Sequence, residues 1–174
     1  MNVIKKLLAV LGLSLSLVAT SAFAHGPTPQ KVDEEIIINA DMATVWNKIK
    51  AFDSFAEWQP AVASIAMTDP DTRVVTLKSG GEFTDSLDEV NEEEHYIGYR
   101  LLEENAKIFP VSFYTINIQV SAEGDKSKVS WSGRFYRGDT GNFPAENLND
   151  DAAVKAMTEY ANSGLAGLKA LVEK

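Results

Sequence analysis

Two neighbouring stretches decide the fold: Ser112–Val120 (SFYTINIQV) and Lys128–Tyr136 (KVSWSGRFY). In each, apolar residues fill every second position and mainly polar residues stand between them. Successive side chains of a β-strand point to opposite faces of a sheet, so this alternation predicts two strands with one covered face. The short turn Glu123-Gly124-Asp125 lies between them and predicts an antiparallel hairpin.

The chain before this hairpin is also rich in predicted strands. Three consecutive isoleucines predict a first strand over Glu34–Asn39, because β-branched residues favour extended structure. The period of two returns after Ser64, and short turns separate the further strands predicted there: Arg73–Lys78, Glu82–Val90 and Glu94–Glu103. About six consecutive antiparallel strands therefore follow the first one.

Helices are predicted in two places. After the first strand, Asp41 is the expected N-cap of a helix that runs to Ala51, and a second short piece over Ser54–Trp58 ends at Pro60. At the C-terminus, Asn149 or Asp150 caps a long helix with one apolar stripe: Val154, Met157, Ala161, Leu165, Leu168 and Val172. A curved sheet wrapped around this last helix covers every apolar face, which predicts an α+β protein.

Two glycines interrupt the long helix. Gly164 and Gly167 each cost a helix about 1 kcal/mol relative to alanine. They indicate either close packing of the helix on the sheet or room left for a ligand, and close packing is slightly favoured.

The first 24 residues have the pattern of a secretory signal peptide. Lys5 and Lys6 precede an apolar stretch, Leu7–Val18, and Ala22-Phe23-Ala24 forms a cleavage pattern of small residues. The stretch is shorter than the roughly 20 residues that a spanning helix needs. We therefore expect cleavage after Ala24 and export of residues 25–174 to the periplasm as a single domain.

Composition narrows the function. The formal net charge of −9 becomes −11 when Lys5 and Lys6 are removed, which disfavours binding to nucleic acid or to anionic lipid. The absence of cysteine excludes thiol nucleophiles and thiolate metal sites. Two carboxylate runs, Asp33–Glu35 and Glu92–Glu94, indicate either solvated surface or a docking patch for a basic partner.

Several segments resemble a known group of proteins. The order of elements, with Val45-Trp46 and Trp58-Gln59-Pro60, resembles the START/Bet v 1-like (SRPBCC) superfamily. Within it, the chain is most similar to the MxaD-type methanol-oxidation accessory proteins. The segments that carry this resemblance are His25–Lys31 (HGPTPQK), Ile108–Tyr114 (IFPVSFY), Val129–Phe135 (VSWSGRF), Asn149–Val154 (NDDAAV), and Gly164-Leu165 with Leu168-Lys169.

The resemblance implies a helix-grip fold with a cavity between the sheet and the C-terminal helix. It also implies a non-enzymatic periplasmic role without a cofactor, in support of methanol dehydrogenase and its cytochrome c electron acceptor. Residues expected to line the cavity are Trp58, Tyr99, Tyr114, Trp131, Phe135, Met157 and Leu165. Such a cavity leaves open a second function, the carriage of a small apolar ligand.

Two weaker chemical hypotheses rest on scarce residues. After cleavage, the α-amine and imidazole of His25 could bind copper together with His95, the only other histidine, although a metal-free surface is the stronger expectation. His95 shares the parity of Tyr99 on its predicted strand, and with Asp85 and Arg100 it could form an acid–base group of cyclase or dehydratase type. Polar residues on a solvent face are the favoured interpretation of that group.

Overall fold

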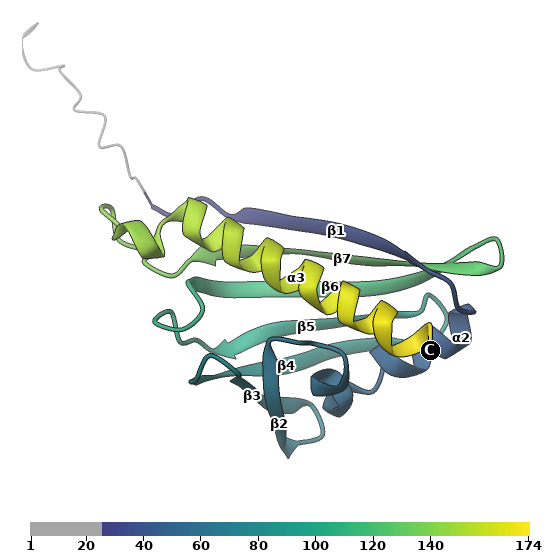
Figure 1. Ribbon diagram of the computed structural model, residues 1–174. Helices are drawn as coiled ribbons and strands as arrows, with labels where there is room; N and C mark the ends of the chain where they lie inside the picture. The colour runs from purple at the N-terminus through teal and green to yellow at the C-terminus, as the bar shows by residue number, and fades with distance from the viewer. Residues whose placement is uncertain (1–25) are drawn as a thin grey trace, which may run out of the picture.

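The computed structural model describes residues 26–174 and shows one antiparallel sheet of seven strands with a long helix lying across it (Figure 1). The strands are arranged in the order β1-β7-β6-β5-β4-β3-β2. Along the chain, the elements are β1 (Gln30–Ile38), α2 (Met42–Ile49), η1 (Phe52–Glu57), β2 (Val62–Asp69), β3 (Thr72–Leu77), β4 (Glu82–Asn91), β5 (Tyr96–Glu103), β6 (Val111–Glu123), β7 (Lys126–Arg137), η2 (Glu146–Leu148) and α3 (Asp150–Val172).

The β6–β7 hairpin confirms the alternation predicted from the sequence. Its inward-facing side chains are buried: Tyr114, Ile116, Ile118, Val120, Val129, Trp131 and Phe135. One irregularity interrupts the pattern where the register between β6 and β7 shifts between Ser112 and Thr115. There Ser112 and Tyr114 are both buried, while Phe113 adopts a left-handed φ of 48° and is 66% exposed. The bulge therefore turns one aromatic ring outward at the start of β6.

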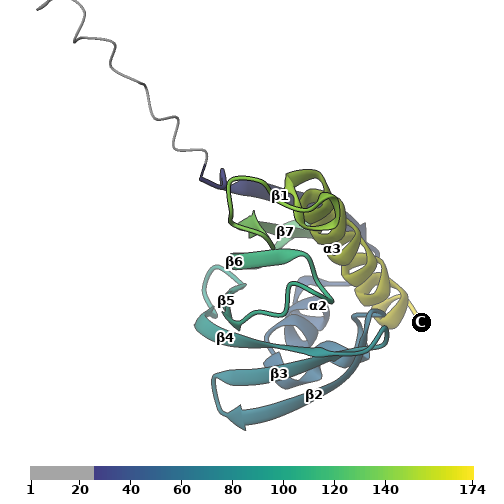
Figure 2. The same ribbon diagram turned by 90° about the vertical axis from the view of Figure 1, so that its left-hand side faces the viewer.

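Helix α3 lies over the concave face of the sheet, which curls from β1 round to β2 (Figure 2). Asn149 caps the helix, since its side-chain oxygen accepts a hydrogen bond from the Ala152 N–H at 2.9 Å. A Cβ atom at Gly164 would lie 2.7 Å from Gln59 Nε2 and 2.9 Å from Trp131 Cζ3, and one at Gly167 would collide with the Trp58 carbonyl. Close packing is therefore the reason for both glycines.

The expected order of a strand, two short helices, a run of strands and a long helix is confirmed. Asp41 caps α2 as predicted, accepting from the Thr44 N–H at 2.9 Å. The prediction that a strand begins at Glu94 is wrong by two residues. The Asn91 side chain accepts hydrogen bonds from the Glu93 and Glu94 N–H groups, which extends the turn up to Tyr96.

Within the described range, no helix combines the length and apolar character needed to cross a membrane. The predicted signal peptide (residues 1–24) and His25 lie outside the described residues.

Candidate functional site

All seven residues predicted to line a cavity are buried beneath α3: Trp58, Tyr99, Tyr114, Trp131, Phe135, Met157 and Leu165. Their rings pack against one another, with centroids 6.1 Å apart for Trp58 and Trp131 and 6.2 Å apart for Tyr99 and Tyr114. The structure thus brings the predicted residues together as an aromatic core. Their contact with a ligand stays a prediction.

A buried ion pair lies within this aromatic core. Arg73 on β3 and Asp85 on β4 are paired across the strands by the register of the sheet, and each is 1% exposed. Arg73 donates to Asp85 Oδ2 from Nη2 at 2.8 Å and from Nε at 3.0 Å, and to the Phe52 carbonyl from Nη1 at 3.0 Å. The Tyr114 hydroxyl donates to Asp85 Oδ1. Every charged group of the cluster therefore has hydrogen-bond partners, as a buried pair requires.

Aromatic rings enclose the guanidinium of Arg73. Its Cζ atom lies 3.9 Å from the ring centroid of Phe52, 4.1 Å from that of Phe55 and 4.9 Å from that of Tyr99. A cation over a ring face is attracted by the ring's quadrupole, and more strongly where water is absent. The same arginine thus joins η1, β3, β4 and β5 in one contact network.

The surroundings of the cluster shift its pKa values. Burial lowers the pKa of Arg73, but the charge of Asp85 outweighs this and holds the pKa above its ordinary value. Burial raises the pKa of Asp85, and the hydrogen bonds from Arg73 and Tyr114 limit that rise. Burial also raises the pKa of Tyr99, Tyr114 and Tyr160, so these phenols remain neutral in the folded protein.

The acid–base group expected from the sequence is only partly assembled. Asp85 and Tyr99 do lie together, but Arg100 is on the outer face and pairs with Asp88 at 3.0 Å. His95 is in the β4–β5 turn and not on a strand, so its expected parity with Tyr99 is wrong. The arginine of the cluster is Arg73, which the sequence reasoning missed. Its parity with Val75 and Leu77, both buried, was the available signal.

A cleft of about 390 Å³ opens beside this core, between α3 and the loops that follow β3 and β5. Its lining includes Leu77, Ile108, Phe109, Ser163 and Tyr160. The Tyr160 hydroxyl is buried and has no hydrogen-bond partner among residues 26–174. A buried polar atom without a partner is uncommon, so Tyr160 is the one side chain here that could receive a polar group from a ligand in the cleft.

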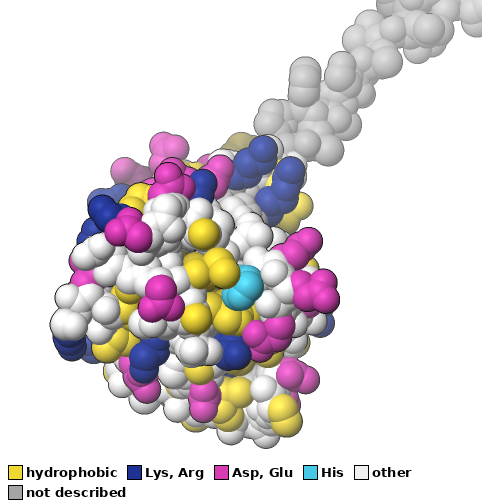
Figure 3. Space-filling model, turned by 90° about the vertical axis from the view of Figure 1, so that its right-hand side faces the viewer, with side chains coloured by type: hydrophobic (Ala, Val, Ile, Leu, Met, Phe, Trp, Pro, Cys, Tyr) yellow, Lys and Arg dark blue, Asp and Glu magenta, His cyan; other side chains and the backbone are white. Residues whose placement is uncertain are grey.

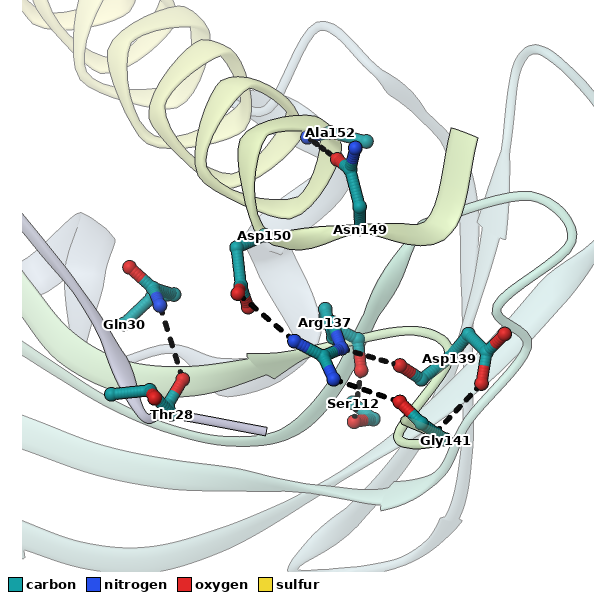
Figure 4. Close-up of polar contacts among 9 residues, drawn as sticks. All are labelled: Thr28, Gln30, Ser112, Arg137, Asp139, Gly141, Asn149, Asp150 and Ala152. Carbon is teal, nitrogen blue, oxygen red and sulfur yellow. Dashed lines mark hydrogen bonds and ion pairs between the residues drawn. The ribbon is translucent and has the colours of Figure 1, made fainter. Parts of the chain in front are cut away.

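A second arginine organises the opposite wall of the fold, where β7 leads into α3 (Figure 4). Arg137 is 7% exposed and pairs with Asp150 at 3.0 Å. It also donates to the carbonyls of Asp139 at 2.7 Å and Gly141 at 2.8 Å, while its own carbonyl accepts from Ser112 Oγ at 2.8 Å. These bonds fix the segment 138–149 against the end of the sheet.

His95 lies at the other end of the molecule, beside hydrophobic side chains and several carboxylates (Figure 3). Its ring contacts Trp46 edge-on with centroids 5.5 Å apart, and its carbonyl accepts from the Val120 N–H. The described part of the chain holds no group of three His, Asp or Glu side chains placed to bind a metal. Copper binding by His25 and His95 stays a prediction, because His25 lies outside that part.

Comparison with known sequences adds the family. Residues 29–173 match the family described as polyketide cyclase / dehydrase and lipid transport. The chain belongs to this family. Members of the polyketide cyclase / dehydrase and lipid transport family are the source of the START-like resemblance, which is thereby confirmed for the superfamily. A comparison with curated proteins finds no match.

Solved structures agree with the family. The protein XoxI from Bacillus cereus superposes with a TM-score of 0.70 at 24% identity, covering 83% of this chain and 96% of its own. The Zhui aromatase/cyclase from a Streptomyces species has a TM-score of 0.67 at 16% identity, covering 84% and 94%. A START superfamily protein from Mycobacterium smegmatis has a TM-score of 0.66 at 13% identity, covering 82% and 97%. The helix-grip fold is therefore shown for this member of the family.

Proposed function

We propose that the protein is a non-enzymatic periplasmic accessory protein of methanol oxidation, which supports the interaction of methanol dehydrogenase with its c-type cytochrome acceptor. One observation carries the proposal: most of the segments that resemble MxaD-type proteins meet at one end of the fold. The likeness to the XoxI structure supports the same assignment.

The contacts at this end join segments far apart in the sequence. Pro110 and Ser112, from the segment Ile108–Tyr114, bond the backbone that follows Phe135: Gly138 N–H donates to the Pro110 carbonyl at 2.9 Å, and Ser112 bonds Arg137. Gln30, beside the lead-in segment, pairs with Phe135, and Asp150 pairs with Arg137. A resemblance spread along the sequence is thus concentrated in space, which is expected of a functional surface.

A reconstituted electron-transfer assay tests the proposal. Methanol dehydrogenase and its c-type cytochrome, purified from the source organism, are assayed with methanol while cytochrome reduction is followed. Addition of the protein should increase the rate at low ionic strength, and the increase should fall as salt screens the acidic surface. An unchanged rate, together with no association with either protein at low salt, would overturn the proposal.

Localisation is tested separately. Periplasmic fractionation, followed by mass spectrometry of the intact protein, should find a chain that begins at His25. Recovery of the uncleaved chain from the cytoplasm would contradict the periplasmic assignment.

The unpartnered Tyr160 hydroxyl favours a second candidate, the binding of a small apolar ligand in the cleft beside α3. Native mass spectrometry of the protein from its own host should then find a co-purifying molecule. The variant Tyr160→Phe should lose it while keeping the fold, whereas Phe143→Ala should retain it. A ligand-free wild-type protein would remove this candidate.

A further inference from the structure

We infer that the end of the sheet around Phe143 is a docking surface for a protein that presents an apolar depression surrounded by lysine and arginine residues. The inference rests on the proposed accessory function and names the surface and the chemistry of the partner. Figure 2 looks onto this end of the molecule.

The first argument is the distribution of exposed apolar side chains. Among the described residues, the three most exposed large hydrophobics are Phe143 at 96%, Phe113 at 66% and Leu102 at 55%. Leu102 is near the end of β5, Phe113 near the start of β6, and Phe143 in the segment after β7. Because β5, β6 and β7 are successive antiparallel neighbours, these three positions lie at the same end of the sheet.

The second argument is that the structure holds these side chains outward. Phe113 adopts a left-handed φ of 48°, a costly conformation for a large side chain, and its ring contacts Tyr136 with centroids 6.4 Å apart. Phe143 stands in a segment fixed by Arg137, by the Gly141 N–H to Asp139 Oδ1 bond at 2.8 Å, and by the Asp139 N–H to Leu148 carbonyl bond at 3.2 Å. An aromatic ring exposed on an ordered backbone loses little entropy when a partner covers it.

Charge selects the partner. The segments 102–107 and 138–151 contain six Asp and Glu residues and one lysine, Lys107. Asp150 is paired with Arg137, while Glu103, Glu104, Glu146 and Asp151 are exposed. Such a rim attracts a basic surface and repels anionic lipid headgroups. An exposed aromatic anchor inside an acidic rim fits a protein that has a basic rim around an apolar depression.

Binding of the tagged full chain to purified methanol dehydrogenase and to the c-type cytochrome, measured at low and high salt, tests the surface. Phe143→Ala should weaken binding at least tenfold without lowering the melting temperature, because the side chain is almost fully exposed. Glu146→Lys should slow association and reduce its salt dependence. Val90→Ala, at a side chain that is 40% exposed and away from this end, is the matched control and should bind like the wild type.

The outcomes separate the two proposals. Wild-type binding that survives both Phe143→Ala and Phe113→Ala would overturn the surface and leave the accessory function standing. Wild-type protein that binds neither partner at low salt would overturn the accessory function and this inference with it. Phe143-dependent binding to phosphatidylcholine vesicles in place of either protein would also overturn the inference.

Discussion

Two nearly buried arginines hold two different regions of this protein together. Arg73 is 1% exposed and pairs with Asp85, and Arg137 is 7% exposed and pairs with Asp150. The remaining partners differ. Arg73 lies against three aromatic rings and one backbone carbonyl, whereas Arg137 bonds two carbonyls of an exposed segment.

The difference shows how one residue type serves stability in one region and surface shape in another. Asp85 is 1% exposed, so the Arg73 pair is formed away from water, and losing one partner leaves a charge that water cannot reach. The Asp150 side chain is 37% exposed, so water can replace part of what Arg137 provides. Damage to the first pair should affect the whole fold, and damage to the second should remain local.

The variant Arg73→Ala should give the largest effect. It leaves the Asp85 carboxylate buried without a counter-charge and removes the cation from between the aromatic rings. We expect a loss of about 3–5 kcal/mol in the free energy of unfolding, measured by urea denaturation.

The double variant Arg73→Met, Asp85→Leu is the control for that experiment. It removes both charges and should recover most of the lost stability, since an apolar pair of similar volume is often as stable as a buried ion pair. A loss below about 1 kcal/mol in Arg73→Ala would mean that water reaches the cluster.

Alkaline pH should affect the same region. The folded-state pKa values of Tyr99, Tyr114 and Tyr160 are raised by burial, so their contribution to stability is complete below the unfolded pKa of about 10. Above that pH the unfolded chain loses these protons and the folded protein keeps them. Stability should therefore fall by roughly 1.4 kcal/mol per pH unit for each tyrosine, and absorbance at 295 nm should show them ionising only on unfolding. Gradual ionisation of all five tyrosines in folded protein would contradict this.

The sequence predicts the frame of the fold well and the polar cluster poorly, for a physical reason. Periodicity reports which face of a strand is covered, and this was enough to place Tyr114, Trp131 and Met157 in the core. It does not report cross-strand register. Arg73 and Asp85 became partners only through the pairing of β3 with β4, and proximity in sequence pointed to Arg100 instead.

The Arg137 region was beyond prediction for a similar reason. Phe143 occupies a segment without periodic pattern, and its exposure follows from bonds that Arg137 makes to backbone carbonyls. The resemblance did mark the flanking segments, Ile108–Tyr114 and Asn149–Val154. That they meet around one arginine is a fact of three-dimensional structure.

The variant Arg137→Gln tests the second half of the comparison. Loss of the charged hydrogen bonds to Asp150, Asp139 and Gly141 should cost roughly 1.5–3 kcal/mol locally. Hydrogen exchange should become faster at the amides of Asp139 and Gly141, with little change in the amides that join β6 to β7. Equal acceleration throughout the hairpin would show that Arg137, like Arg73, supports the whole fold.

The smallest effect is expected at a carboxylate that is exposed and far from both arginines. Glu92 accepts hydrogen bonds from Trp46 Nε1 at 2.7 Å and Lys50 Nζ at 3.1 Å, which lower its pKa below the ordinary 4.5. A lowered folded-state pKa adds stability above the unfolded value and loses it as pH falls through the folded one. The stability difference between wild type and Glu92→Gln should therefore be present at pH 7 and shrink below about pH 4.3. Urea midpoints followed by tryptophan fluorescence measure it, with Glu93→Gln in the same turn as control. A pH-independent difference would show that the contact acts through packing, and that solvent exposure makes this charge irrelevant to stability.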